Sequence, residues 1–161
     1  MGADQPDGPG GAARGGVRGL DQFLSTFTNR IDKKGRVSVP AEFRAVLAAR
    51  QSSKLLLFPA VYFEALEGAA DDYLVDLDKR IDSLPPFSEE RDALIQSIKP
   101  NIVACSFDSE GRVGISAELK ERAFLDDVAT FVGLGSSFQI WQPERWAIRQ
   151  RELRSPKRPR P

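Results

Sequence analysis

The sequence of 161 residues contains no histidine and only one cysteine, Cys105. A single thiol cannot close a disulfide within one chain, and structural zinc sites need several Cys or His ligands. Catalytic triads that use histidine as their base are excluded because the chain has no histidine. We therefore expect no enzymatic activity, no metal and no cofactor.

Long hydrophobic runs are absent as well. No apolar segment approaches the roughly 20 residues that a membrane-spanning helix needs, and the N-terminus lacks the apolar region of a secretory signal. Hydrophobic residues nevertheless make up 41% of the chain, with ten Phe and two Trp, which is enough to form a core. These features predict a cytoplasmic protein with one ordinary domain or two small ones.

The chain also lacks an excess of charge of either sign, because 23 Lys and Arg balance 23 Asp and Glu. The charges are unevenly distributed, however. Residues 21–50 carry six basic against three acidic side chains, residues 60–99 four against ten, and residues 149–161 six against one. Two basic segments thus enclose an acidic one, and either basic segment could face an anionic partner such as nucleic acid.

An internal repeat is the most informative pattern in the sequence. Residues 31–44 return as residues 107–120, with every position displaced by 76 and no gap. Asp, Gly, Arg, Val, Ala and Glu are identical at equivalent positions, and three further positions exchange one apolar residue for another. A repeat of this kind predicts two copies of one supersecondary unit.

Apolar periodicity and turn residues place similar elements in both copies. The first copy is expected to form strands at 23–31, 36–39 and 54–58, with a helix at 41–49. The second is expected to form strands at 102–107, 112–115, 128–134 and 138–141, with helices at 117–124 and from Pro143 onward. Residues 57–63 also resemble residues 140–146 in sequence. This second similarity predicts that the elements of each unit follow the order strand, strand, helix, strand, helix.

The acidic middle of the chain is predicted to be helical. An apolar stripe from Tyr73 to Leu84 predicts one helix, which Pro85 ends, and Ser88 is the expected N-cap of the next. The whole chain is therefore predicted to have an α+β fold, in which two tandem β/α repeats form one pseudo-symmetric unit with helices between and after them. The predicted divisions are a disordered extension (1–22), repeat 1 (23–69), a helical acidic connector (70–100), repeat 2 (101–150) and a basic disordered tail (151–161).

The repeated Asp-x-x-Gly-Arg segment suits a turn between two strands. The Asp can accept hydrogen bonds from backbone N–H groups of the turn, and the Gly can adopt a positive φ. The turn-forming residues are Asp32, Gly35, Asp108 and Gly111, and the arginines that follow are Arg36 and Arg112. A hairpin turn closed by a local ion pair accounts for a single copy, whereas duplication favours a further role.

The two copies of the turn differ in charge. The first carries four basic side chains against one Asp, whereas the second carries one Arg against two acids. Clustered cations favour phosphate binding, and an Arg can bond guanine with two donors. The candidate DNA-binding residues are Arg30, Lys33, Lys34, Arg36 and Arg112, and the first copy should make most of the phosphate contacts. The alternative is that Lys33 and Lys34 are merely solvated charges at a loop tip.

Other features are better explained by structure than by function. Residues 133–137 are rich in Gly and Ser but lie between two strands, which favours a hairpin turn over a phosphate loop. The four Asp of residues 71–78 have helical spacing, which favours a solvated helix face over a metal site. Trp141, Trp146 and Cys105 are expected to pack in the core.

Taken in order, these motifs closely resemble those of the bacterial MraZ family. The resemblance rests on the opening FLSTF (23–27), on both Asp-x-x-Gly-Arg motifs, on VPAEFR (39–44) and on the closing FQIW (138–141), and it covers about residues 23–149. It implies two tandem AbrB-like halves in one compact unit. It also implies a sequence-specific, DNA-binding transcriptional regulator.

The same resemblance implies how such a regulator would work. It implies a homo-oligomeric ring, associated with the nucleoid, that binds short direct repeats at the promoter of the division and cell-wall gene cluster, with repression the expected effect. It marks Asp32, Arg36, Asp108 and Arg112 as the DNA-facing signature. Double-stranded DNA and further copies of the chain are the expected partners, whereas no membrane and no small-molecule substrate are expected. The alternatives are an AbrB-like antitoxin, for which two fused copies would be unusual, and an oligomeric scaffold whose loops bind protein.

Overall fold

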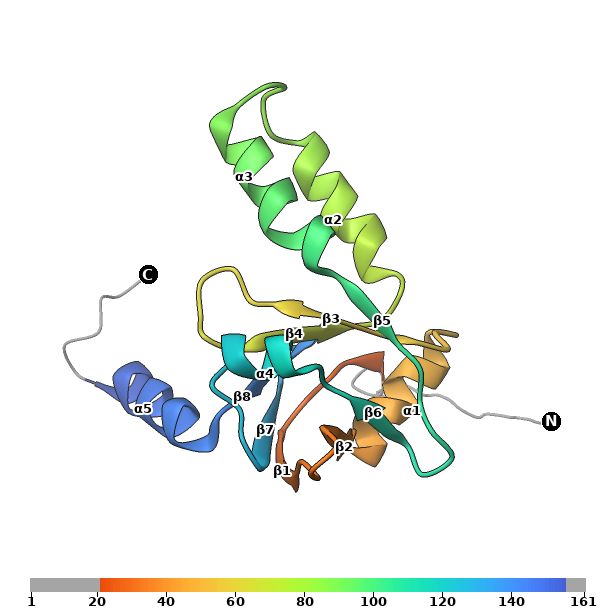
Figure 1. Ribbon diagram of the computed structural model, residues 1–161. Coiled ribbons are helices and arrows are strands. Elements are labelled where there is room, and N and C mark those ends of the chain that lie inside the picture. Colours follow the sequence, from red (N-terminus) through yellow and green to blue (C-terminus); the bar gives the residue numbers. More distant parts are fainter. Residues whose placement is uncertain (1–20, 156–161) are drawn as a thin grey trace.

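The computed structural model describes residues 21–155 (Figure 1) and shows the predicted α+β fold. The strands are β1 (Thr26–Arg30), β2 (Arg36–Ser38), β3 (Leu55–Pro59), β4 (Leu66–Ala69), β5 (Val103–Cys105), β6 (Arg112–Gly114), β7 (Val128–Gly133) and β8 (Phe138–Trp141). The helices are α1 (Ala41–Ala49), α2 (Tyr73–Asp82), α3 (Glu89–Ile98), α4 (Ala117–Arg122) and α5 (Pro143–Arg154), and a 3₁₀ helix (Lys99–Asn101) follows α3.

The strands of the two halves interleave. Six of them form one antiparallel sheet in the order β1-β7-β8-β4-β3-β5, while β2 and β6 form a separate two-stranded ribbon. This order is symmetric about the β8–β4 pair, because β1 pairs with β7 as β5 pairs with β3. The first strand of each half thus lies beside the third strand of the other half, so neither half completes the sheet alone.

In the first repeat the predicted order of elements is wrong after the third strand, where a helix was expected. Residues 60–65 form a loop, closed by a 2.9 Å hydrogen bond from the N–H of Ala60 to the carbonyl of Ala65, and the unpredicted strand β4 follows. Pairing makes β3 equivalent to β7, so the likeness of 57–63 to 140–146 does not reflect structural equivalence. Pro143 stands in the first turn of α5, where proline is favoured, whereas Pro59 is the last residue of a strand.

The main core centres on Phe43 of α1, which is fully buried. Its ring contacts four other Phe rings edge-on or tilted, with centroid distances of 5.3 Å to Phe23, 5.4 Å to Phe27, 6.3 Å to Phe131 and 4.8 Å to Phe138. These rings come from both halves of the chain. The cluster therefore joins the two halves of the chain. Truncation of one such buried ring costs about 3–5 kcal/mol of stability.

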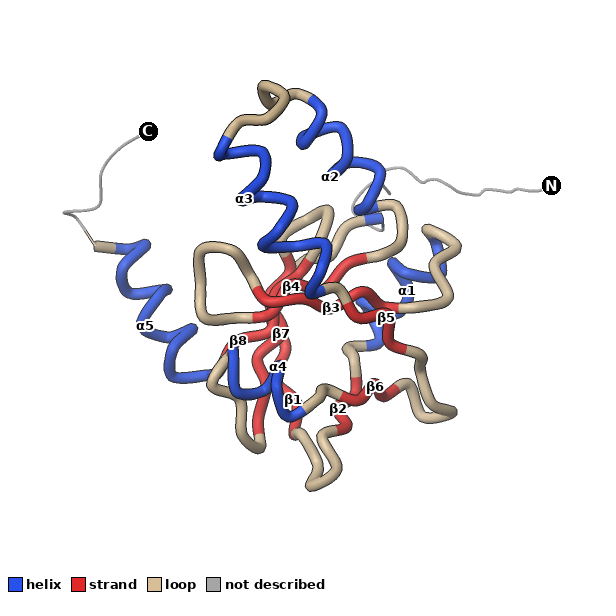
Figure 2. Tube along the Cα trace, turned by 45° about the horizontal axis from the view of Figure 1, so that its top comes forward, coloured by secondary structure: helices blue, strands red, loops and turns tan. Residues whose placement is uncertain are grey.

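Helices α2 and α3 form a hairpin that projects from the sheet (Figures 1 and 2). Leu77, Ile81 and Ile98 of the hairpin form one buried cluster with Phe58 of β3. Ser88 is the N-cap of α3, as predicted, and its Oγ accepts a 3.1 Å hydrogen bond from the N–H of Arg91. The Asp side chains of residues 71–78 are exposed, which agrees with the predicted solvated face.

The described residues extend beyond two of the predicted divisions. The carbonyl oxygen of Asp21 accepts hydrogen bonds of 2.6 and 3.2 Å from the Arg50 guanidinium, and α5 continues to Arg154. The rest of the extension and the tail that were predicted to be disordered lies outside the described residues. The divisions at 69/70 and 100/101 stay predictions.

Candidate nucleic-acid interface

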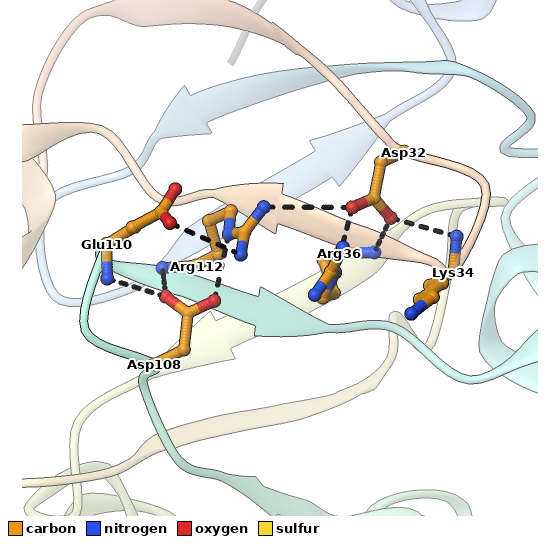
Figure 3. A network of polar contacts seen from close by, with 6 residues as sticks. All are labelled: Asp32, Lys34, Arg36, Asp108, Glu110 and Arg112. Carbon is orange, nitrogen blue, oxygen red and sulfur yellow. Dashed lines mark hydrogen bonds and ion pairs between the residues drawn. The ribbon is translucent and has the colours of Figure 1, made fainter.

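The first Asp-x-x-Gly-Arg turn is closed by the carboxylate of Asp32 (Figure 3). Its Oδ1 accepts hydrogen bonds of 2.9 Å from the backbone N–H groups of Lys34 and Arg36, and its Oδ2 accepts one of 2.8 Å from Arg36 Nε. Gly35 has a φ of 83°. The side chain of the Asp thus fixes both the turn and the guanidinium that follows it.

The second turn repeats this geometry. Oδ1 of Asp108 accepts 2.9 Å hydrogen bonds from the N–H groups of Glu110 and Arg112, and Oδ2 accepts one of 2.8 Å from Arg112 Nε. Gly111 has a φ of 76°. The backbone N–H of Arg36 and that of Arg112 are the main causes that hold the pKa values of Asp32 and Asp108 below their ordinary value.

The β2–β6 ribbon brings the two arginines to one face. In its antiparallel register Arg36 lies opposite Gly114, and Ser38 lies opposite Arg112. Side chains alternate along a strand, so Arg36 and Arg112 share the outer face while the buried valines between them face the core. Gly114 has no side chain to cover Arg36.

The two arginines differ in what surrounds them (Figure 3). The Nη1 atom of Arg112 lies 3.8 Å from Oδ2 of Asp32, and its Nη2 atom lies 3.8 Å from Oε2 of Glu110. Its hydrogen bond to Asp108 is the main cause that raises the pKa of its guanidinium. Within residues 21–155, Arg36 forms an ion pair with Asp32 alone, and its side chain is 40% exposed against 25% for Arg112.

A groove of about 500 Å³ runs beside the ribbon. It is lined by Arg30, Ile31, Asp32, Lys33, Arg36, Ser38, Arg112 and Asp127. Four of the five predicted DNA-binding side chains therefore surround one groove. Lys34 is exposed but does not line it.

Sequence reasoning missed three residues of this region. Ser38 and Asp127 line the groove. Asp127 gave no local signal in the sequence, because β1 and β7 meet only in the folded chain. There the carbonyl of Asp127 accepts a 2.8 Å hydrogen bond from the N–H of Ile31. Arg44 donates from Nε to the carbonyl of Val39 at 3.1 Å. Its guanidinium lies against Gly111 of the second turn. Arg44 had a signal, since it is the last residue of the repeated segment.

The Gly/Ser-rich segment, the two Trp and Cys105 have the structural roles expected of them. Residues 134–137 close the β7–β8 hairpin, with a 2.9 Å hydrogen bond from the N–H of Leu134 to the carbonyl of Ser137. Trp141 is buried, Trp146 packs against its cluster, and burial raises the pKa of the Cys105 thiol. Residues 21–155 contain no group of three or more Cys, Asp or Glu side chains placed to hold a metal ion. None of their helices combines the length and the apolar character needed to cross a membrane.

Related sequences identify the family. A protein of Pelagibacter ubique named "Transcriptional regulator MraZ" is 41% identical over 133 residues, which cover 81% of this chain and 86% of the relative. The chain belongs to the MraZ family. MraZ proteins of the same name from Rickettsia bellii (44% identity over 128 residues, 79% of this chain and 85% of the relative) and Xanthobacter autotrophicus (42% over 126 residues, 78% and 80%) are similarly close. The profile of the family described as "MraZ protein, putative antitoxin-like" matches residues 101–158.

Proposed function

We propose that this MraZ-family chain is a transcriptional regulator that binds double-stranded DNA with the β2–β6 ribbon and the groove beside it. The observation that carries the proposal is the set of charges around the groove, where four cations face two carboxylates. The region is locally positive although the chain as a whole has no net charge. The relatives that bear the name of transcriptional regulators support the same conclusion.

The first turn makes most of the phosphate contacts in this proposal. Lys33 and Lys34 are exposed at its tip, whereas Ser109 and Glu110 hold the equivalent positions of the second turn. Each cation that neutralises a phosphate releases counterions from DNA, so the first turn contributes affinity and the second contributes little.

Arg36 is the residue that reads a base edge. Its Nε is already bonded to Asp32, which fixes the plane of the guanidinium and leaves the two Nη groups to donate to O6 and N7 of a guanine. The major groove admits a two-stranded β-ribbon. Arg112 has carboxylates near Nε, Nη1 and Nη2, so it positions the ribbon and Asp32.

The regulator acts as a homo-oligomeric ring on direct repeats in the promoter of the division and cell-wall genes, and it represses them. One ribbon with a few cations binds weakly. A ring that presents several ribbons to successive repeats gains affinity through effective concentration, without any new type of contact. The resemblance to the family and this gain in affinity from multivalent binding support the proposed ring.

A binding titration with the DNA upstream of the protein's own gene tests the proposal. The protein should shift this DNA, Arg36→Ala should lose most of the binding, and Arg112→Ala should lose less. Arg80→Ala, on α2 of the projecting hairpin, removes an equal charge away from the ribbon and should bind like the wild type. Salt-resistant binding that survives Arg36→Ala would overturn the proposal.

A further inference from the structure

The tip of the α2–α3 hairpin carries an aromatic side chain that the fold itself does not use. Phe87 is 96% exposed and has a φ of 62°, a left-handed conformation that a bulky residue seldom adopts. A ring in water adds nothing to the core, and the strained backbone opposes folding. Both features make sense if the ring is buried in an assembly.

The surroundings of this ring are acidic. Residues 82–92 contain Asp82, Glu89, Glu90 and Asp92 against the single cation Arg91. The hairpin therefore presents an apolar knob with a negative rim.

A groove of complementary character lies between the 60–65 loop and α5. It has a volume of about 310 Å³ and is lined by Tyr62, Phe63, Glu64, Trp141, Arg145, Ile148, Arg149 and Glu152. Tyr62 is 86% exposed, and the ring centroid of Phe63 lies 5.6 Å from that of Trp141. Helix α5 carries four Arg against two Glu. The two Arg that line the groove pair with Glu64 and Glu152, so the positive surplus of α5 comes from Arg151 and Arg154, beside the groove.

We propose that Phe87 of one copy inserts into the groove between the 60–65 loop and α5 of a second copy. The hairpin tip points away from the sheet, whereas α5 lies at another edge of the molecule (Figures 1 and 2), so knob and groove are separate surfaces. Such a contact is head-to-tail and can close into a ring. The acidic tip of the hairpin then lies beside α5, a helix with a net positive charge. The inference rests on the proposed homo-oligomer but not on DNA binding.

Light scattering on the full-length protein after size-exclusion chromatography tests the contact. Wild-type protein should have the mass of an oligomer, and Phe87→Ser should reduce it to that of a monomer with an unchanged circular dichroism spectrum. Val75→Ser is the matched control, because Val75 is also an exposed apolar residue of this hairpin (56%) and should leave the oligomer intact. If Phe87→Ser keeps the wild-type mass, or if both variants dissociate equally, the inference is wrong. A monomeric wild type would overturn the proposed assembly as well.

A mixing experiment tests the head-to-tail geometry. Ile148→Glu spoils the groove and should also yield monomers, whereas Leu153→Glu, at a residue of α5 that does not line the groove, should not. Phe87→Ser keeps its groove and Ile148→Glu keeps its knob, so an equimolar mixture can form one interface only. The mixture should have the mass of two chains. A mixture that stays monomeric contradicts the proposal.

Discussion

Arg112 of the second repeat places Nη1 3.8 Å from Oδ2 of Asp32 in the first repeat, across the β2–β6 ribbon. Within residues 21–155, no reciprocal ion pair joins Arg36 to Asp108. The backbone of the ribbon is nearly symmetric, so the difference lies in the side chains. One arginine has three carboxylates within 4 Å and the other has one, so the charge of Arg36 is the less neutralised of the two.

Replacement of Arg36 by lysine should separate charge from base recognition. Lysine keeps the positive charge but has no planar fork that Asp32 can orient. We expect Arg36→Lys to bind unrelated DNA within a few-fold of the wild type, while discrimination against a changed guanine falls by about 1–3 kcal/mol. Paired titrations with the cognate site and a base-substituted site measure this, with Arg112→Lys as the control. Equal losses on both DNAs would show that Arg36 reads no base.

Removal of a lysine from the first turn should change the dependence of binding on salt. For both Lys33→Ala and Lys34→Ala, we expect the slope of log K against log salt to fall by about 1, because each lysine pairs with one phosphate. The loss should be similar for all DNA sequences. Lys79→Ala, on the exposed face of α2, is the control and should keep the wild-type slope. Unchanged slopes in the two turn variants would show that Lys33 and Lys34 are solvated charges of the loop that contact no phosphate.

Elements with a strong local pattern were predictable from the sequence, and β4 was not. The bounds of α1 and β8 agree with those predicted, because apolar spacing and flanking prolines are local signals. Strand β4 is a short segment, Leu66–Ala69, whose Gly68 disfavours a strand on propensity. The ring of Phe138 explains that glycine, since it lies only 2.3 Å from where a Cβ would be. Such a reason appears only after strands far apart in sequence have paired.

The candidate site likewise combines features that local sequence predicts with features that depend on the pairing of distant strands. The sequence predicts each turn, because Asp, Gly and Arg act within five residues. It does not predict that β2 and β6 pair, which places Arg112 beside Asp32 from 80 positions away. Nor does it predict Asp127, which lies in the groove through the pairing of β1 with β7. Charge counts along the chain therefore located the basic side chains but not the carboxylates that lie opposite them in the fold.

The two Asp carboxylates should make stability depend on pH in the acid range. Their pKa values are lowered in the folded protein, chiefly by backbone hydrogen bonds, relative to about 3.9 for an unfolded Asp. The unfolded chain then binds more protons between these values, so the stabilisation is complete above about pH 4 and is lost as the pH falls through the folded pKa values. Urea midpoints measured from about pH 6 to pH 2 should fall less steeply for the Asp32→Asn, Asp108→Asn double variant. Asp76→Asn, in an exposed position on α2, is the control, and parallel curves for all three proteins would contradict the prediction.

The two turn glycines should differ in their tolerance of alanine although both have positive φ. A Cβ at Gly111 would lie 2.8 Å from the guanidinium of Arg44, a flexible side chain that can move. At Gly35 it would lie 2.7 Å from the backbone oxygen of Ile115, whose N–H is bonded to the Gly35 carbonyl at 2.8 Å and holds the strand in place. We expect Gly111→Ala to lower the free energy of unfolding by about 1–2 kcal/mol through its left-handed backbone, and Gly35→Ala to cost about 1–3 kcal/mol more. Urea denaturation measures both, with Gly114→Ala as a control that meets no atom within 4 Å. Equal losses of stability at Gly35 and Gly111 would contradict the prediction, because they would mean that the backbone at Ile115 moves as easily as the Arg44 side chain.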